Sequence, residues 1–284
     1  MKVISKASEM QREAEALRRR GKRIGVVPTM GYLHEGHLSL IRIAASRSDI
    51  VVLTLFVNPA QFAPGEDYST YPRDPKRDLA LAESAGAAIV FMPEAQEMYP
   101  PGYLTYVEVE SITKLLEGKS RPTHFRGVAT IVAKLFNITK PHVAVFGQKD
   151  AQQAAVIRRM AADLNFDVEI VVAPIFREPT GLAMSSRNVY LSPALRAEST
   201  VLYRSLRLAE DLIGRGERNA STIASEMMKL IRAQPSAAVD YVSLADPETL
   251  GELSTLTPGS SALVSLAVRI GNVRLIDNTL VRIP

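Results

Sequence analysis

The sequence predicts an α/β protein: a Rossmann-like, doubly wound parallel sheet followed by a smaller α+β domain. Up to about residue 176, short and nearly all-apolar runs alternate with amphipathic stretches. This alternation is typical of a parallel sheet that helices cover on both faces. Beyond that point two helical stretches come first and strand-like runs follow them. We therefore expect a first domain over residues 1–176 and a smaller domain over residues 177–284.

The first domain contains five expected strands with helices between them. The strands are Ile24–Val27, Ile50–Phe56, Ala88–Met92, Val143–Phe146 and Val168–Val172, and the helices are Leu38–Ser48, Pro75–Ala85, Val128–Ile138 and Gln152–Leu164. In such sheets ligands bind beyond the carboxyl ends of the strands, where the strand order reverses. The loops PTMG, VNPAQF and GQKD each follow a strand and are therefore candidate binding loops.

The remaining segments complete the expected organisation. The first 23 residues are expected to form a polar helix that belongs to the fold, since they lack the apolar stretch of a secretory signal. The second domain should contain helices Ala194–Gly214 and Ala220–Ala233 and strands Val239–Leu244, Ala262–Ile270 and Val273–Ile276. The segment REPTGLAMSSRN lies at the junction of the two domains.

Composition excludes several classes of function. The chain has 284 residues, 46% of them hydrophobic, and no cysteine, which excludes disulfides, thiolate nucleophiles and cysteine-based zinc sites. No apolar run approaches the roughly 20 residues of a membrane span, so we expect a cytoplasmic protein with no membrane partner. The net charge of +4 and the basic cluster at residues 18–23 could suggest nucleic acid. A solvated helix end explains this cluster better because no aromatic residues interleave with it.

The segment PTMGYLHEGHLSLIR, residues 28–42, carries two histidines three positions apart. The zinc-protease motif spaces its histidines four apart, and no third ligand stands nearby, so we expect no metal site here. A phosphate site fits better, because a strand ends, a glycine-containing turn follows and a helix begins near Gly36. The start of a helix presents unpaired N–H groups to anions, and two imidazoles add donors. Packing of one histidine in the core remains an alternative.

A histidine pair that opens a helix after the first strand resembles the HxGH signature of the nucleotidyltransferase superfamily. That superfamily also carries a late KMSKS-like loop, and Met184–Arg187 (MSSR) stands in the corresponding order. The shared chemistry is attack on the α-phosphate of a nucleoside triphosphate with release of pyrophosphate. The segment SSRN could also be only a turn and a helix cap.

Five further segments make the resemblance specific. They are FVNPAQF (56–62), DYSTYPRD (67–74), HFRGVATIVAKLFN (124–137), VFGQKDAQQ (145–153) and GLAMSSRNVYLS (181–192). With PTMGYLHEGHLSL they closely resemble the pantoate–β-alanine ligase family. The resemblance implies ATP-dependent joining of (R)-pantoate to β-alanine through a pantoyl adenylate, with Mg2+ carried on ATP. It also implies a homodimer.

The resemblance further implies the roles of individual residues. The ATP site would comprise Met30, Gly31, Tyr32, Leu33, His34, Glu35, Gly36, His37, Gly147, Gln148, Lys149, Asp150, Phe176, Met184, Ser185, Ser186 and Arg187. Among them His37, His34, Lys149 and Arg187 would be catalytic, with His37 as the acid. Gln61 and Gln153 would hold pantoate, and Gln61 would also border the β-alanine site. A carboxamide suits this task because it donates and accepts hydrogen bonds without adding charge.

Two other functions remain open at this point. A relative that transfers a nucleotide to a phosphate acceptor would share the histidine motif, but such an acceptor calls for more Arg or Lys than the carboxamides Gln61 and Gln153 provide. An RNA-binding module is the third alternative, although the C-terminal region is neither notably basic nor rich in aromatic residues. The loop around Tyr71 is expected to cover the site, as long irregular loops often do.

Overall fold

The computed structural model describes all residues, 1–284, and divides the chain into two compact units. The first unit comprises Met1–Gln148 and Gln153–Pro174, and the second comprises Lys149–Gln152 and Ile175–Pro284. The short segment Lys149–Gln152 therefore belongs to the C-terminal unit, although the sequence placed it in the first domain.

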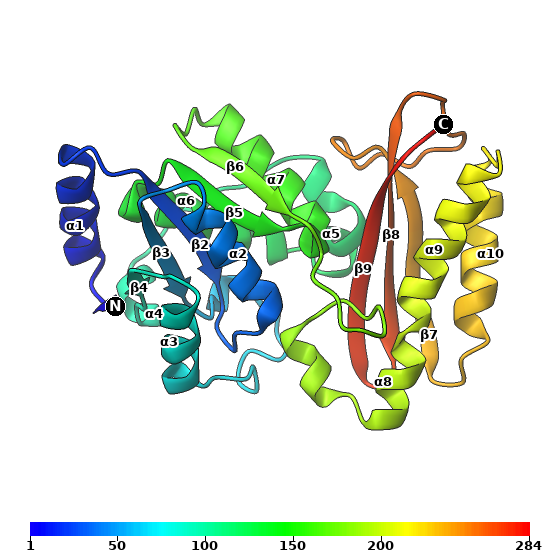
Figure 1. Ribbon diagram of the computed structural model, residues 1–284, viewed down its shortest axis with the longest axis horizontal. Coiled ribbons are helices and arrows are strands. Elements are labelled where there is room, and N and C mark those ends of the chain that lie inside the picture. The colour runs from blue at the N-terminus through cyan, green and yellow to red at the C-terminus, as the bar shows by residue number, and fades with distance from the viewer. The chain divides into compact units, whose positions relative to one another are not determined.

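A six-stranded parallel sheet forms the centre of the first unit, with strand order β1-β4-β3-β2-β5-β6 (Figure 1). The strands are β1 Lys2–Ile4, β2 Ile24–Thr29, β3 Ile50–Leu55, β4 Ile89–Phe91, β5 Val143–Gly147 and β6 Glu169–Ala173. The chain winds from β2 through β3 to β4 and then returns to β5 on the other side of β2. The strand order therefore reverses between β2 and β5, and the predicted doubly wound fold class is confirmed.

Helices cover both faces of this sheet. They are α1 Ala7–Arg19, α2 Glu35–Ala45, α3 Pro75–Ser84, α4 Ala95–Met98, α5 Leu116–Ser120, α6 His124–Thr139 and α7 Ala151–Asp163, with short 3-10 turns η1 Pro59–Gln61, η2 Ile112–Lys114 and η3 Gln148–Asp150. Because parallel crossovers are right-handed, this strand order puts α2 and α3, which contact each other, on one face and α1 and α6, which also contact each other, on the opposite face. Consecutive strand residues point to opposite faces of a sheet. Val26 and Val27 are both fully buried, as expected for a strand covered on both sides.

The second unit packs helices against a three-stranded antiparallel sheet of order β7-β8-β9. Its elements are η4 Ser186–Tyr190, α8 Pro193–Ser199, α9 Val201–Gly214, α10 Ala220–Arg232, β7 Ala237–Ala245, β8 Ser261–Ile270 and β9 Val273–Arg282. Figure 1 shows α9 and α10 running along this sheet, where they bury an apolar core that includes Leu206, Ile223, Val264 and Leu266. The predicted α+β character of this region is confirmed.

Three local expectations differ from the structure. The N-terminal segment contains a short strand, β1, before its helix, because Lys2–Ile4 pairs with Ile89–Phe91 at the edge of the sheet. The single helix expected over Ala194–Gly214 is two helices that meet at Thr200. The last strand extends to Arg282 because all ten residues of β9 pair with β8.

Candidate active site

The histidine segment begins at the point where the strand order reverses. Strand β2 lies between β3 and β5, with Gly25 opposite Val143 and Val26 opposite Ala144. The segment from Met30 to His37 leaves the carboxyl end of β2, and Gly147–Asp150 leaves the carboxyl end of β5. Parallel α/β sheets bind ligands at such a reversal. Two of the loops selected from the sequence therefore start at the two strands that flank it.

A buried carboxylate shapes the turn between β2 and α2. Gly31 has a φ of +88°, and a Cβ there would lie 3.0 Å from Oδ2 of Asp78. Tyr32 follows with a φ of 52°. Asp78, on α3 and 3% exposed, accepts hydrogen bonds from the backbone N–H groups of Tyr32 at 2.8 Å and Leu33 at 2.7 Å. Sequence reasoning missed Asp78, since 44 residues separate it from His34 and no local pattern marks it.

The two histidines come together at the start of α2. His34 is the N-cap residue and His37 is the third residue of the helix; their ring centroids lie 4.0 Å apart. The backbone N–H of His34 donates to Nδ1 of His37 at 3.3 Å. Because Nδ1 accepts this bond, the neutral His37 ring carries its hydrogen on Nε2. His37 is therefore a hydrogen-bond donor at a helix N-terminus, where the backbone also favours an anion.

The carboxamide of Gln61 has a defined orientation. Gln61 ends the 3-10 turn after β3 and is 8% exposed. Its Oε1 accepts from Nδ2 of Asn58 at 3.1 Å, and its Nε2 contacts Sδ of Met30 at 3.0 Å. Met30 belongs to the predicted ATP segment, so the structure brings a predicted nucleotide residue beside the predicted pantoate residue. Asn58 in turn accepts the hydroxyl hydrogen of Tyr99 at 2.8 Å.

The second predicted nucleotide segment follows β5. A Cβ built on Gly147 would meet no heavy atom within 4 Å, which leaves space beside the backbone. The Nζ of Lys149 lies 3.6 Å from Oδ1 of Asp150, and the Lys149 carbonyl accepts from Nδ2 of Asn278 on β9 at 2.9 Å. Gln153 lies in the first turn of α7 and is partly buried, whereas its neighbour Gln152 is 5% exposed.

The segment Met184–Arg187 leads into η4 of the C-terminal unit. The side chain of Ser185 accepts from the backbone N–H of Arg187 at 3.3 Å, so the alternative interpretation as a helix cap describes the local structure correctly. The backbone N–H of Met184 donates to the carbonyl of Phe176 at 3.0 Å, which joins two of the predicted nucleotide positions. Asn188, which the sequence did not identify, donates to the Ala183 carbonyl at 3.1 Å and fixes the turn.

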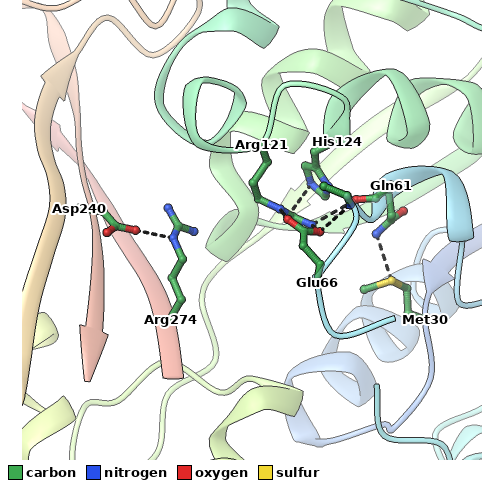
Figure 2. Close-up of polar contacts among 8 residues, drawn as sticks. Met30, Gln61, Glu66, Arg121, His124, Asp240 and Arg274 are labelled. Atoms are coloured by element: carbon green, nitrogen blue, oxygen red, sulfur yellow. Dashed lines mark hydrogen bonds and ion pairs between the residues drawn. The ribbon is translucent and has the colours of Figure 1, made fainter. Parts of the chain in front are cut away.

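A second polar cluster contacts Gln61 through its main chain (Figure 2). Arg121 and His124, near the start of α6, both contact the Gln61 carbonyl, and Arg121 pairs with Glu66. Burial and the nearby charge of Arg121 lower the pKa of His124 to about 4. The segment beginning HFRG contributed to the family resemblance, but no pattern in it predicted the contact between His124 and Gln61.

No group of three or more His, Asp or Glu side chains is placed to hold a metal ion. None of the helices is both long and apolar enough to cross a membrane.

Tyr71, in the loop expected to cover the site, is 6% exposed and packs edge-on against Phe62, with ring centroids 6.1 Å apart.

Comparison with known proteins decides the family. The family model described as pantoate-beta-alanine ligase matches residues 2–280. The chain belongs to the pantoate-β-alanine ligase family. Pantothenate synthetase of Roseiflexus sp. strain RS-1 is 56% identical over 278 residues, 98% of each chain. That of Thermotoga petrophila is 53% identical over 280 residues, 99% of each chain. The expected family is thus confirmed, and the chain is a ligase.

Solved structures agree with this assignment. Pantothenate synthetase from Thermus thermophilus superposes with a TM-score of 0.91 at 47% identity, covering 98% of this chain and 99% of that one. The ligase from Francisella tularensis, described as complexed with beta-gamma ATP and beta-alanine, gives a TM-score of 0.80 at 34% identity, covering 99% and 97%. The ligase fold therefore extends over both units of the chain.

Proposed function

We propose that the chain catalyses the ATP-dependent condensation of (R)-pantoate with β-alanine, giving pantothenate, AMP and diphosphate through pantoyl adenylate. The observation that carries the proposal is the pair His34 and His37 at the N-terminus of α2, at the reversal of strand order, in a chain that the ligase family matches from residue 2 to residue 280. This combination supports nucleotide binding by the first unit and acyl activation as its chemistry.

In the first half-reaction, a carboxylate oxygen of pantoate attacks the α-phosphorus of ATP. The bond from that phosphorus to its bridging oxygen breaks, and diphosphate leaves with the electron pair. His37 donates from Nε2 to a phosphate oxygen as charge develops there, and His34 assists at the same helix end. Lys149 and Arg187 supply positive charge to the phosphates, and Arg187 has the planar donor set that suits them. Fixed donors aimed at developing charge are typically the largest contribution to catalysis.

In the second half-reaction, the amine of β-alanine attacks the acyl carbon of pantoyl adenylate. The bond from that carbon to the phosphate oxygen breaks, AMP leaves, and the new amide nitrogen loses a proton. Gln61 and Gln153 hold pantoate through both steps, so that the acyl carbon stays in place while the nucleophile changes. Orientation of this kind replaces a covalent enzyme intermediate, which agrees with the absence of cysteine.

The proposal includes Mg2+ bound with ATP and a homodimer in the cytoplasm. Mg2+ keeps several waters and binds chiefly through substrate phosphates in such sites. Light scattering of the pure protein at several concentrations tests the dimer.

The test of the proposed function is the product set. Purified protein is mixed with Mg-ATP and pantoate, with and without β-alanine, and nucleotides are separated at intervals. Equal amounts of AMP, diphosphate and pantothenate that accumulate over many turnovers, only when all three substrates are present, support the proposal. Nucleotide transfer to a phosphate acceptor, with no response to pantoate, would assign the site to a nucleotidyltransferase instead.

A further inference from the structure

We propose that Glu66, Arg121 and His124, here called the Gln61 clamp, are positioning residues that hold Gln61 in place to bind pantoate. The inference rests on the proposed function, in which the Gln61 carboxamide contacts pantoate. It adds three residues that act on the substrate only through Gln61.

The clamp acts on the main-chain carbonyl of Gln61. It accepts from Nη2 of Arg121 at 3.2 Å and contacts Nδ1 of His124 at 2.9 Å (Figure 2). A carbonyl oxygen has two lone pairs, so these two side chains use its full capacity. The end of η1 is thereby attached to residues at the beginning of α6.

Arg121 is itself held in place by Glu66. Its Nε and Nη2 each contact one carboxylate oxygen of Glu66 at 2.6 Å, and the two side chains are 19% and 24% exposed. The Arg121 guanidinium, which has five N–H groups, thus makes four contacts: two with Glu66, one with the Gln61 carbonyl and one with the His124 ring. Arg121 is therefore committed to positioning, and its charge is paired with Glu66 rather than available to the pantoate carboxylate.

Glu66 closes the clamp onto the loop after η1. Its Oε2 also accepts from the backbone N–H of Ala63 at 3.2 Å. Burial opposes ionisation of Glu66, but the hydrogen bonds and charge of Arg121 outweigh burial and lower its pKa. The carboxylate therefore remains ionised and keeps its two contacts with Arg121 over the neutral pH range.

His124 acts as a neutral donor. Because Nδ1 faces a carbonyl it carries the hydrogen, and Nε2 then accepts from Nη1 of Arg121 at 3.3 Å. The charged groups that act on this ring are Arg121, Glu66 and Glu117. A second hydrogen on the ring would point at the guanidinium, so the neutral form is the one that fits the clamp.

The clamp matters because the Gln61 side chain has little other fixation. Asn58 binds its Oε1, but its Nε2 meets only the Sδ of Met30, and a thioether is a weak acceptor. A stronger acceptor on a substrate can replace that sulfur contact. Gly127 on α6 allows the close approach, since a Cβ there would lie 2.2 Å from the Ala60 carbonyl oxygen. A shift of about 1 Å in such a group can cost about 10²-fold in rate.

The test is a double-mutant cycle of Arg121→Gln and Gln61→Ala, read as kcat and KM for each substrate from AMP formation. We expect Arg121→Gln to raise the KM for pantoate about tenfold or more, with the KM for ATP within about twofold. In the Gln61→Ala background the same substitution should change the KM for pantoate by less than about twofold, because the group it positions is gone. Equal effects of Arg121→Gln in both backgrounds would overturn the clamp.

The matched control is Arg274→Gln. Arg274 on β9 pairs with Asp240 on β7 at 2.6 Å and is 18% exposed, so this ion pair has the same length and similar burial to that of Arg121 (Figure 2). Its loss should lower Tm by an amount similar to that of Arg121→Gln without changing the KM for pantoate. An equal rise in the pantoate KM from Arg274→Gln would show that the effect is general destabilisation and would overturn the inference.

A conservative variant provides a second readout. His124→Asn keeps an amide donor near the Nδ1 position and should retain a pantoate KM within about threefold of the wild type, whereas His124→Phe should raise it about tenfold. Equal values for the two variants would contradict the clamp.

If Gln61→Ala itself leaves the pantoate KM unchanged, the assignment of Gln61 in the proposed function fails and the clamp fails with it. If Gln61→Ala raises that KM and the effects add, only the clamp fails.

Discussion

At the scale of single residues, His37 makes a structural contact and has a proposed catalytic role. Its Nδ1 accepts from the backbone of His34, and its Nε2 carries the hydrogen that the proposed reaction uses. His37→Ala removes both, whereas His37→Asn restores an acceptor near Nδ1 without a donor at the Nε2 position. We expect both variants to lower kcat about 10²-fold or more, measured as AMP release. A kcat near the wild-type value in His37→Asn would exclude His37 as the donor.

Asp78 is the residue that most clearly shapes the turn between β2 and α2. Asp78→Ala leaves two backbone N–H groups, those of Tyr32 and Leu33, without their acceptor in a buried site. We expect a loss of about 2–4 kcal/mol in the free energy of unfolding and a higher KM for ATP, measured by denaturant titration and initial rates. Asp246→Ala is the control, because Asp246 accepts from the N–H groups of Glu248 and Thr249 in an exposed turn. It should leave the KM for ATP unchanged.

The candidate site was only partly predictable at this scale. The histidines, Gln61 and the MSSR segment are visible in the sequence because each lies in a short local motif. Asp78 and Arg121 act on residues 46 and 60 positions away, so their roles follow from the fold rather than from a pattern. The ligand roles assigned to all the predicted site residues, including His34, His37 and Gln61, stay predictions.

At the scale of elements, the approach of α6 to η1 depends on Gly127. A Cβ at this position would meet the Ala60 carbonyl oxygen at 2.2 Å and the Gln61 nitrogen at 2.6 Å. Gly127→Ala should therefore push η1 away from α6 and raise the KM for pantoate about tenfold. Gly214→Ala is the matched control, since a Cβ on that α9 residue meets nothing within 4 Å. A pantoate KM unaffected by Gly127→Ala would show that this contact does not control Gln61.

Within the C-terminal unit, Arg177 and Asp277 link the segment after β6 to β9. Arg177 binds both carboxylate oxygens of Asp277 at 2.7 and 2.9 Å and stacks over the ring of Tyr203. Arg177→Leu leaves a carboxylate that is 2% exposed without its partner, so we expect a loss of about 3–5 kcal/mol in unfolding free energy. The double variant Arg177→Leu/Asp277→Leu should recover most of that loss in a denaturant titration. If the double variant does not recover this stability, the lost free energy comes from the packing of Arg177 on Tyr203 instead.

The strands were predictable where they are central and less so at the edges. The central strands β2, β3 and β5 are continuous apolar runs bounded by turns, so composition alone defines them. Strand β1 has only three residues and depends on pairing with β4, and no local sequence pattern predicts that pairing. Likewise, the break at Thr200 separates two helices whose apolar pattern continues across it.

At the scale of the whole molecule, pH changes stability through His124 and His142, two partly buried histidines. Burial and the charge of Arg121 lower the pKa of His124 from 6.5 to about 4, so the unfolded chain binds a proton at this ring between those values and the folded chain does not. Stability should therefore fall as pH drops from about 6.5 to about 4, by up to about 3 kcal/mol from this residue. Burial lowers the pKa of His142 as well, and that ring adds to the same trend.

The measurement is the pH dependence of the unfolding free energy for the wild type and His124→Asn. The variant lacks the titrating ring, so its stability should decline less between pH 6.5 and pH 4, with a slope smaller by up to about 1.4 kcal/mol per pH unit. Identical slopes would show that His124 does not remain neutral in the folded chain.

For the whole molecule, the proposed reaction activates pantoate as an acyl adenylate. This predicts that one carboxylate oxygen of pantoate ends on the phosphate of AMP. Pantoate labelled with ¹⁸O in its carboxylate should be turned over with Mg-ATP and β-alanine, and the AMP analysed by mass spectrometry. One ¹⁸O atom per AMP, with unlabelled diphosphate, is the predicted result. Unlabelled AMP, or ADP with labelled inorganic phosphate, would exclude an acyl adenylate.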